Sequence, residues 1–455
     1  MTMGTLAMVA DSVQGVLHGE DRRFAAVSTD TRSLRADELF IALRGPHFDA
    51  ADFIADAERQ GAAGAVVERQ VDSRLPQVIV PDTRAALANL ARAWRDRFNV
   101  PVIGVTGSNG KTTVKELCAA ILRADTGADD AVLATRGNLN NDIGLPLMVL
   151  ELRPSHRYAV FEMGASGLGE IAPLAGIARP TVGIVTNAGP AHLEGFGSVE
   201  GVARTKGEMF AALPQDGTAI INRDDDFYDE WLARCAGCRT LSFGLAPHAD
   251  VRATDIRANG NTLDFTLHLP GTHFPVHLAM AGQHNVCNAL AAAAATLAAG
   301  VERGAVQQGL AAATQVSGRL RRLESPTGAV VYDDSYNANP ASLMAAIEFL
   351  AAQPGKNWLV LGDMKELGPD SKALHAQCGK AARKAGLAGL FCVGEEARAA
   401  AEAFGSGSAC FDTREALIAA VRDELAHGVA VLVKGSRSMG MEKVAAALAG
   451  TDGEG

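Results

Sequence analysis

Aromatic side chains are scarce in this sequence: phenylalanine, tryptophan and tyrosine together make up only 5% of its 455 residues. Alanine supplies much of the 48% hydrophobic share, and glycine is frequent, with 48 residues. Small side chains of this kind are typical of α/β layers in which helices pack closely. The chain is too long for a single hydrophobic core, and its size predicts about three domains.

Basic residues are in the minority, because 42 Lys and Arg residues stand against 52 Asp and Glu residues, giving a formal net charge of -10. This balance argues against a protein that coats nucleic acid, although a local basic pocket for phosphates remains open. We therefore expect a small-molecule partner and no nucleic acid.

Export and anchoring signals are also missing. The longest apolar run, residues 289–299, is alanine-rich and too short to span a bilayer, and the start carries Asp11 and no basic segment. The seven cysteines form no disulfide framework, and the Cys235–Cys238 CxxC pair lacks the second pair or histidine that a zinc site would need. We expect a protein of the reducing cytoplasm without membrane contact.

Glycine is organised around one motif. The apolar run 102–106 breaks into glycines and then into helix-forming residues, which is typical of a strand, a phosphate-binding loop and a helix N-terminus. Backbone N–H groups in such a loop approach phosphate oxygens, Lys111 adds a positive charge, and the Thr112 hydroxyl can bind Mg²⁺. The expected nucleotide-binding residues are Gly107, Ser108, Asn109, Gly110, Lys111, Thr112 and Thr113.

This loop departs from the standard P-loop motif, which places glycine five residues before Gly110, where Val105 stands. The core of the motif is therefore TGxxGKT. The alternative interpretation is a glycine turn that opens a helix with an exposed lysine. By itself the loop predicts binding of a nucleoside triphosphate and nothing more specific.

The region before the P-loop predicts a small α/β domain. Strand patterns at 25–27, 38–43 and 63–67 surround a helix near 50–60. A turn offers hydroxyl, carboxylate and guanidinium groups that suit a polyanionic ligand, although such a turn taken alone is more often merely solvated. Its candidate substrate residues are Ser28, Asp30, Thr31 and Arg32.

After the P-loop, strands and helices alternate to about residue 313, which predicts a largely parallel sheet. An asparagine-rich loop, with Asn138, Asn140 and Asn141, could grip a polar ligand or be an ordinary turn. The strand 158–161 ends at Glu162, where a carboxylate can face the P-loop metal.

A further strand, residues 182–185, leads to His192, and Lys206 follows in the sequence RTKGE. Taken singly, a histidine here is more often structural, and the lysine is more often a solvated helix residue. Alternation of apolar and polar residues over 249–278 predicts antiparallel strands. The helix after it places Asn285 and Asn288 on one face, where their amides could read a base.

A linker at 314–319 precedes four strand patterns, residues 330–333, 358–361, 390–393 and 429–433, which alternate with helices. Two of these strands end in polar clusters, 333–340 and 434–438, at the edge where doubly wound sheets build sites. We predict an α/β protein with a small N-terminal domain (1–99), a central P-loop-type domain with a mostly parallel sheet (100–314) and a C-terminal Rossmann-like doubly wound domain (315–455).

Seven strings occur along the chain in this order: GNLNNDIGLP, AHLEGFGS, KGEMF, GQHNVCNALAA, DDSYNANP, LGDMKELG and VKGSRS. With these strings the sequence closely resembles the Mur ligase family, the ATP-dependent amide-forming enzymes of peptidoglycan synthesis, over nearly its whole length. It is most similar to the members that add D-alanyl-D-alanine to UDP-N-acetylmuramoyl-tripeptide. The short TGxxGKT loop is similar to the loop of this family.

The resemblance assigns roles to the candidate residues. It implies that the N-terminal turn binds the UDP part of the substrate, that Thr112 and Glu162 meet one Mg²⁺, and that His192 helps to hold a second. Lys206 matches a lysine that takes up CO₂ as a carbamate. Asn285 and Asn288 match asparagines on the adenine side, Arg319 an arginine that reaches the ATP phosphates, and Asp334 an acidic residue at the nucleotide.

The dipeptide site is less well defined by the sequence. A DNPR-type stretch, usual in the ligases that add diaminopimelate, does not occur in the last domain. A cation there could pair with the dipeptide carboxylate. Candidate substrate residues in the two later domains are Asn138, Asn140, Asn141, Tyr336, Asn337, Asn339, Lys434 and Arg437.

The implied reaction forms an acyl phosphate from a carboxylate and the γ-phosphoryl group of ATP, and an amine then displaces phosphate. We expect domains that open and close around the reactants, and a monomer. Alternatives are a Mur-type ligase that adds diaminopimelate or lysine, a folylpolyglutamate synthase, and an ATP-gated binding module without catalysis. The third residue of the acceptor peptide, diaminopimelate or lysine, is not legible in the sequence.

Overall fold

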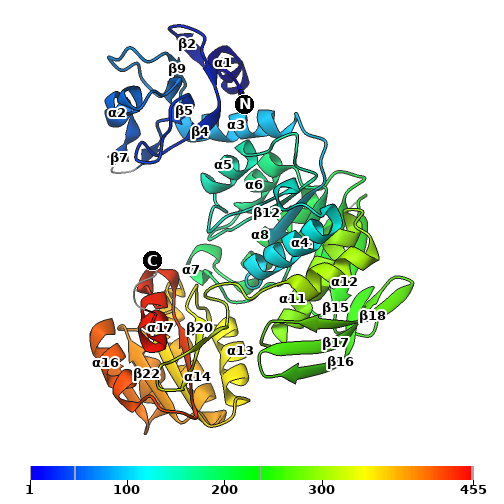
Figure 1. Ribbon diagram of the computed structural model, residues 1–455, viewed down its shortest axis with the longest axis vertical. Coiled ribbons are helices and arrows are strands. Elements are labelled where there is room, and N and C mark those ends of the chain that lie inside the picture. Colours follow the sequence, from blue (N-terminus) through cyan, green and yellow to red (C-terminus); the bar gives the residue numbers. More distant parts are fainter. Residues whose placement is uncertain (1, 46–47, 236, 452–455) are drawn as a thin grey trace.

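The computed structural model describes residues 2–45, 48–235 and 237–451, and it has three main sheets that follow one another along the chain (Figure 1). The first is five-stranded. Its strands, in spatial order, are β2 (Val16–His18), β9 (Gln77–Ile79), β8 (Gly64–Val67), β5 (Glu38–Ile41) and β4 (Ala26–Ser28). Helices α1 (Leu6–Val13) and α2 (Ile54–Arg59) and the two-stranded pairs β1–β3 (Gly4–Thr5, Arg23–Phe24) and β6–β7 (Arg44–Gly45, Phe48–Asp49) accompany this sheet.

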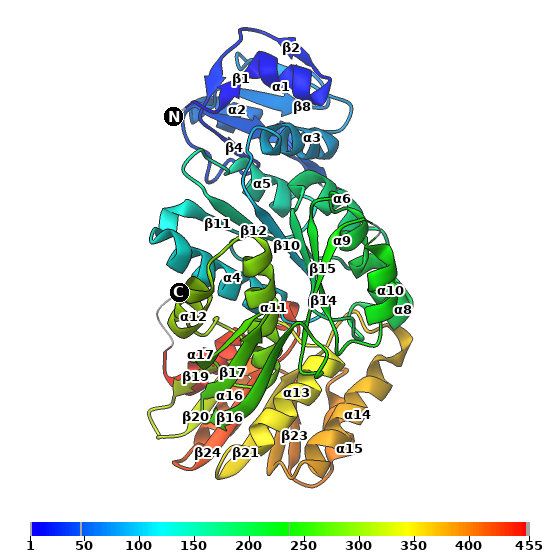
Figure 2. The same cartoon turned by 90° about the vertical axis from the view of Figure 1, so that its right-hand side faces the viewer.

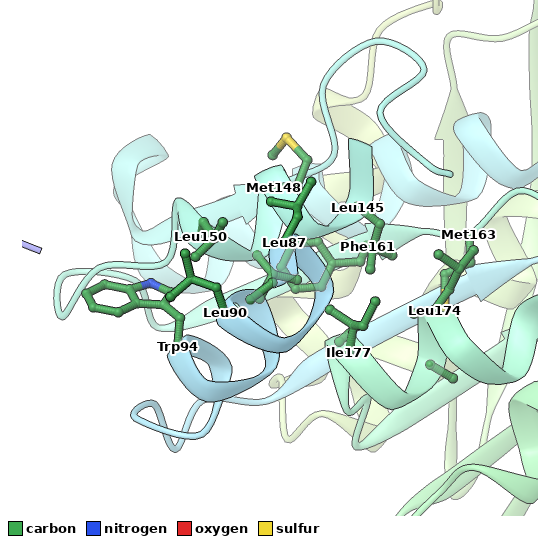
Figure 3. Packing of buried hydrophobic residues seen from close by; sticks show 14 of the residues in the cluster. Leu87, Leu90, Trp94, Leu145, Met148, Leu150, Phe161, Met163, Leu174 and Ile177 are labelled. Carbon is green, nitrogen blue, oxygen red and sulfur yellow. The ribbon is translucent and has the colours of Figure 1, made fainter. Parts of the chain in front are cut away.

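Helix α3 (Thr83–Arg95) joins the first sheet to the rest of the molecule. The Asp82 carboxylate caps its N-terminus by accepting hydrogen bonds from two backbone N–H groups of the first turn. One face of α3 packs on α1, and another packs on α5 (Gly144–Leu150) and α6 (Ile171–Ala178). Figure 3 shows Leu87, Leu90 and Trp94 of α3 among apolar side chains of the following domain.

The second sheet has nine strands and contains the P-loop strand. Their spatial order is β11 (Val132–Ala134), β12 (Tyr158–Glu162), β10 (Val102–Thr106), β13 (Val182–Val185), β14 (Thr218–Asn222), β15 (Arg239–Gly244), β16 (Val251–Asn259), β17 (Thr262–Leu269) and β18 (Thr272–Leu278). The strands run parallel from β11 to β16, and β16 to β18 are antiparallel, as the alternating pattern over 249–278 predicted.

Alternate side chains of β10 point to opposite faces of this sheet, as the two-residue repeat of a strand requires. Ile103 and Val105 enter the core beneath α4 (Lys111–Thr126), α11 (His284–Ala298) and α12 (Arg303–Ala312). Val102 enters the core shared with α3. On this second face α6 and α9 (Glu208–Ala211) pack on the strands, next to α8 (Val199–Lys206) and α10 (Tyr228–Arg234).

The third sheet has six strands, in the spatial order β19 (Arg321–Glu324), β20 (Val330–Asp334), β24 (Val429–Lys434), β21 (Lys356–Gly362), β22 (Gly389–Val393) and β23 (Ser408–Phe411). All are parallel except β19. Helices α13 (Pro340–Ala351), α14 (Ser371–Lys384), α15 (Arg398–Phe404), α16 (Arg414–Glu424) and α17 (Glu442–Ala449) flank it (Figure 2). The predicted three-part α/β architecture is therefore confirmed, including the doubly wound last sheet.

Within the described part of the chain, no helix combines the length and apolar character needed to cross a membrane.

Candidate active site

The predicted phosphate-binding loop lies between β10 and α4. Gly107 has a φ of +143°, and a Cβ added there would lie 1.9 Å from the Thr186 hydroxyl oxygen. Gly110 has a φ of +82°, and its added Cβ would lie 2.4 Å from the Asn288 side-chain oxygen. Both positions thus require glycine, because backbone conformation and close approach each exclude a side chain.

Lys111 is the first residue of α4, and its ammonium group folds back over the loop. Its Nζ donates to the carbonyl oxygens of Gly107 at 2.7 Å and Ser108 at 3.1 Å. Burial lowers the pKa of this lysine to about 8, against the opposing effect of the Glu162 carboxylate. The group still carries its proton at neutral pH, and it stands at a helix N-terminus that favours phosphate.

Glu162 ends β12 and is almost completely buried, with 1% exposure. Its Oε1 accepts a hydrogen bond from Asn140 Nδ2 at 2.8 Å, and its backbone N–H donates to the Thr135 hydroxyl at 3.0 Å. Its Oε2 is buried and has no hydrogen-bond partner among the described residues. A buried carboxylate oxygen without a partner fits a cation, and Mg²⁺ prefers such oxygen ligands.

A cavity of about 250 Å³ lies where the P-loop, the asparagine loop and the C-terminal domain meet. It brings together predicted residues from segments that are far apart in the sequence. Its lining includes Ser108, Asn109, Gly110, Lys111, Asn138, Asn140, Asn141, Glu162, His192, Arg319, Tyr336, Asn337, Asn339 and Arg437. Nucleotide phosphates and groups of the last domain would therefore face each other here.

Tyr336 stands between two guanidinium groups in this cavity. The Arg319 guanidinium carbon lies 4.2 Å from the ring centre and that of Arg437 lies 5.7 Å from it. Arg319 also donates to the Thr112 hydroxyl at 3.4 Å. The ring thus lies within cation–π distance of two guanidinium groups, one that also contacts the P-loop and one on the C-terminal domain.

A second cavity, of about 380 Å³, adjoins the other side of the P-loop. Asn285 and Asn288 line it, and the two amides are linked, since Asn288 Nδ2 donates to Asn285 Oδ1 at 2.8 Å. Asp334, Arg319 and Thr113 line it as well. The residues predicted for the nucleotide are therefore close together.

Lys434, grouped with the dipeptide residues by the sequence, lines this second cavity. Its Nζ is buried and donates to Asp334 Oδ2 at 2.5 Å and to the Asn337 carbonyl at 3.0 Å. Burial lowers the pKa of Lys434, and the Asp334 carboxylate opposes that effect. In this arrangement the lysine orients the Asp334 carboxylate within the second cavity.

His192 and Lys206 of the central domain are the other two residues that were predicted to hold metal. The His192 Nδ1 atom is in contact with the Glu366 carboxylate of the C-terminal domain. Lys206 is 2% exposed, its Nζ donates to the Ala165 carbonyl at 3.2 Å, and it lies 5.1 Å from the centre of the Phe196 ring. Burial, and next the charge of Lys111, lower the pKa of Lys206 well below its usual value.

The N-terminal turn lies at a separate cavity of about 880 Å³, between the first sheet and the central domain. Ser28 and Asp30 line it, together with Arg136, Arg153 and His156 from the central domain. The exposed Arg32 guanidinium pairs with Asp30 and holds the pKa of that carboxyl at about 2. Thr31 lies between these two residues on the same turn.

Sequence reasoning missed two residues at these contacts. Asn187 binds the backbone of Asn109 from the loop after β13, and Glu366 of the last domain meets His192. Asn339, which the sequence grouped with the dipeptide residues, binds the Asn109 side chain in the P-loop. It directly precedes Pro340, a combination typical of a helix start.

Comparison with known proteins agrees with this geometry. The family models for the Mur ligase middle domain and for the Mur ligase, glutamate ligase domain match residues 105–296 and 318–437. The UDP-N-acetylmuramoyl-tripeptide–D-alanyl-D-alanine ligase of Escherichia coli is 43% identical over 447 residues, which cover 98% of each chain.

Two solved structures are also similar. MurF from Acinetobacter baumannii has a TM-score of 0.92 at 36% identity, with 99% of both chains covered. MurF ligase from Thermotoga maritima in complex with ADP has a TM-score of 0.82 at 30% identity, with 94% of this chain and 97% of that chain covered. The chain belongs to the Mur ligase family of ATP-dependent peptide ligases.

Proposed function

We propose that the protein joins D-alanyl-D-alanine to UDP-N-acetylmuramoyl-tripeptide at the expense of ATP, forming the pentapeptide precursor of peptidoglycan, ADP and phosphate. One observation supports this most strongly. A single cavity is lined by the P-loop, by Glu162 with its unpartnered carboxylate oxygen, and by polar groups of the C-terminal domain. The names of the relatives that match the whole chain point to the same reaction.

ATP binds with its phosphates on the residues 107–113 and with its base on the side of Asn285 and Asn288. Arg319 reaches the phosphates from the linker, and Lys434 keeps the Asp334 carboxylate oriented beside the nucleotide. The amide pair of the two asparagines offers both donors and acceptors, as a base edge requires.

Thr112 and Glu162 would hold one Mg²⁺, and His192 with modified Lys206 would hold a second. Bound Mg²⁺ neutralises charge that develops on the transferred phosphoryl group. The unpartnered Glu162 Oε2 supports the first site. His192 would exchange its contact with Glu366 for the metal.

Lys206 carries a carbamate in the active enzyme. The ammonium group first loses one proton, the neutral amine attacks CO₂ to form an N–C bond, and the nitrogen releases a second proton, so that a cation becomes an anion. The support for this step is the position of the amine, which is buried beside Ala165 and close to the positive charge of Lys111. The new anion would supply a negatively charged oxygen ligand for Mg²⁺.

The three domains divide the substrates among them. Residues 1–99 hold the UDP part through Ser28, Asp30, Thr31 and Arg32, and residues 100–314 hold ATP. Arginines that the central domain contributes to the 880 Å³ cavity beside the N-terminal turn suit the diphosphate. Residues 315–455 bind the dipeptide, whose carboxylate pairs with Arg437, while Tyr336 and Asn337 line its position.

The reaction begins when the terminal carboxylate of the tripeptide attacks the γ-phosphorus of ATP. The resulting acyl phosphate has a good leaving group, and the dipeptide amine attacks its carbonyl carbon and displaces phosphate. Orientation of two reactants in one closed cavity contributes at most about 7–11 kcal/mol. Closure also excludes water that would hydrolyse the acyl phosphate.

The protein acts as a monomer in the cytoplasm, where both substrates are soluble. A ligase that adds diaminopimelate or lysine, and a folylpolyglutamate synthase, are the alternative functions. Each uses the same ATP chemistry with a different amine or acceptor.

The test is to mix the protein with ATP, Mg²⁺, UDP-N-acetylmuramoyl-tripeptide and D-alanyl-D-alanine, and to follow phosphate release and product mass together. We expect phosphate release only when both substrates are present. The product should be the tripeptide nucleotide with one D-alanyl-D-alanine unit added. ATP consumption with glutamate and folate, or none at all, would contradict the proposed substrates. Tripeptides that end in diaminopimelate and in lysine are compared in parallel.

A further inference from the structure

The Asn339 side chain forms hydrogen bonds through both its amide oxygen and its amide nitrogen. The bond from the nitrogen joins two domains. The Asn339 Oδ1 accepts a hydrogen bond from the Ser342 backbone N–H at 2.9 Å, and the Ser342 hydroxyl accepts from the Asn339 backbone N–H at 3.1 Å. These bonds cap the N-terminus of α13. The Asn339 Nδ2 donates at 2.8 Å to the side-chain oxygen of Asn109 in the P-loop.

Asn109 is fixed from the opposite side by the central domain. Its backbone N–H donates to Asn187 Oδ1 at 3.0 Å, and its carbonyl oxygen accepts from Asn187 Nδ2 at 3.1 Å and from the Thr186 hydroxyl at 2.6 Å. The backbone of this residue is therefore held within its own domain. Its side chain is held by the C-terminal domain, and Gly110 and Lys111 follow directly.

We propose that Asn339 is a positioning residue that ties the C-terminal domain to the P-loop, so that the loop is fully ordered for ATP only when this domain is docked. The side chain is 9% exposed, so the bond lies largely out of water, where its loss leaves polar groups without partners. This inference rests on the proposed function for its catalytic readout.

This tie links ATP use to the arrangement of the domains. When the C-terminal domain moves away, the Asn109 side chain loses its partner and the loop before Lys111 loses one restraint. Idle ATP hydrolysis is then disfavoured in the undocked protein. Asn339 is thereby assigned to the P-loop and not to the dipeptide.

The test separates the cap from the tie with two substitutions. Asn339→Ser keeps a residue that caps helices well but is too short to reach Asn109, whereas Asn339→Ala removes both interactions. We expect Asn339→Ser to lower kcat and to weaken MgADP binding, each by about 3- to 10-fold, as one lost hydrogen bond predicts. Its melting temperature should stay close to that of the unmodified protein. Ser342→Ala removes the hydroxyl part of the cap and leaves the bond to Asn109 in place, so it serves as the control and should retain more MgADP affinity than Asn339→Ser.

A double-mutant cycle with Asn109→Ala identifies the partner. In that background Asn339→Ser should cause no further loss of MgADP affinity, measured by titration calorimetry. Unchanged kcat and affinity in Asn339→Ser, or equal losses with and without Asn109, would overturn the proposal. The calorimetric arm needs no ligation, so it tests the tie even if the protein forms no pentapeptide, a result that would refute only the proposed function.

Discussion

Lys206 is a lysine almost without access to water, and its ammonium group donates a hydrogen bond to the Ala165 carbonyl. An uncharged amine in this position is a nucleophile for CO₂, and the resulting carbamate would be a metal ligand. The sequence alone favoured a solvated helix lysine, since the helix position said nothing about burial. Only the resemblance to the family reversed that interpretation, and the observed burial agrees with the reversal.

We expect Lys206→Gln to reduce ligation at least about 100-fold, because removal of an anion that holds a catalytic metal costs several kcal/mol. Phosphate release measures this loss. In ¹³C-bicarbonate, the unmodified protein should show one carbamate signal by NMR, and Lys206→Gln should not. Lys115 is an equally buried lysine that donates to the Thr135 carbonyl at 2.7 Å, so Lys115→Gln should keep the signal. Persistence of the signal in Lys206→Gln would contradict the assignment.

His375 makes the stability of the C-terminal domain depend on pH. It has no exposure, its Nε2 accepts from the Met364 N–H at 3.0 Å, and its Nδ1 lies 2.8 Å from the Ser371 carbonyl. Burial lowers the pKa of this histidine below 6.5, against the Ser371 carbonyl, which raises it. As the pH falls below 6.5, this histidine therefore takes up a proton more readily in the unfolded chain than in the folded protein. The free energy of unfolding decreases as a result.

His375→Gln should lower the free energy of unfolding by about 2 kcal/mol at pH 7.5, because two buried hydrogen bonds are disturbed. At pH 5 the difference in the free energy of unfolding between the two proteins should be smaller. The unmodified protein loses the stabilisation that neutral His375 provides, whereas the glutamine variant has no such group to titrate. Urea unfolding at both pH values measures this. The exposed His18→Gln is the control, and a His375→Gln difference that is the same at both pH values would be inconsistent with this account.

At the scale of elements, α3 belongs to two domains at once. The segment 83–95 lies within the predicted N-terminal region, yet Trp94 donates from Nε1 to the Leu152 carbonyl at 3.1 Å in the central domain. Figure 3 shows its ring beside Leu150. Helix α3 therefore fixes the orientation of the N-terminal domain, and the domain limit at residue 99 remains a prediction.

Trp94→Ala should destabilise the protein by about 3–5 kcal/mol, because it removes a large buried side chain and leaves a cavity between the domains. Trp94→Phe keeps most of the buried apolar area and loses the hydrogen bond to the Leu152 carbonyl, so it should destabilise the protein clearly less than Trp94→Ala. Urea denaturation measures both variants. Leu232→Ala, at a residue with 40% exposure, is the surface control. An equal loss in Trp94→Ala and Leu232→Ala would show that α3 does not join the two cores.

Most elements could be predicted because their signals are local. The apolar run into Gly107 and Lys111, and the alternation over residues 249–278, appear in the structure as β10–α4 and as the β16–β18 strands. The short β11 and the role of α3 could not be predicted. Their apolar residues are ordered by neighbours far along the chain, and periodicity does not identify those neighbours.

At the scale of the whole molecule, the C-terminal domain touches the central domain at several places near the cavity, among them the hydrogen bond from Arg319 to Thr112. Asn339 meets Asn109, and Glu366 meets His192 beside α7 (Leu193–Phe196), which Figure 1 shows next to the last domain. These contacts are polar, as expected of an interface that opens and closes. The linker between the domains runs from Ala313 to Leu320 and includes Gly318, with a φ of +70°.

We expect the free protein to be more extended in solution than the protein with a non-hydrolysable ATP analogue, UDP-N-acetylmuramoyl-tripeptide and D-alanyl-D-alanine. The physical reason is that the ligands bind both domains and favour the docked state. Small-angle X-ray scattering measures the radius of gyration in each case. The dipeptide without nucleotide is the control and should have little effect. Identical scattering in all samples would rule out closure.

The sequence by itself determined the order of strands and helices, the P-loop and the groups available for catalysis, because residue type and spacing act over a few neighbours. The tertiary structure decided which of those groups meet. Lys434 turned to Asp334, 100 residues away, and Asn339 reached Asn109 across 230 residues. Such pairings depend on how sheets and domains pack, and packing is set by surfaces that form only when the whole chain has folded.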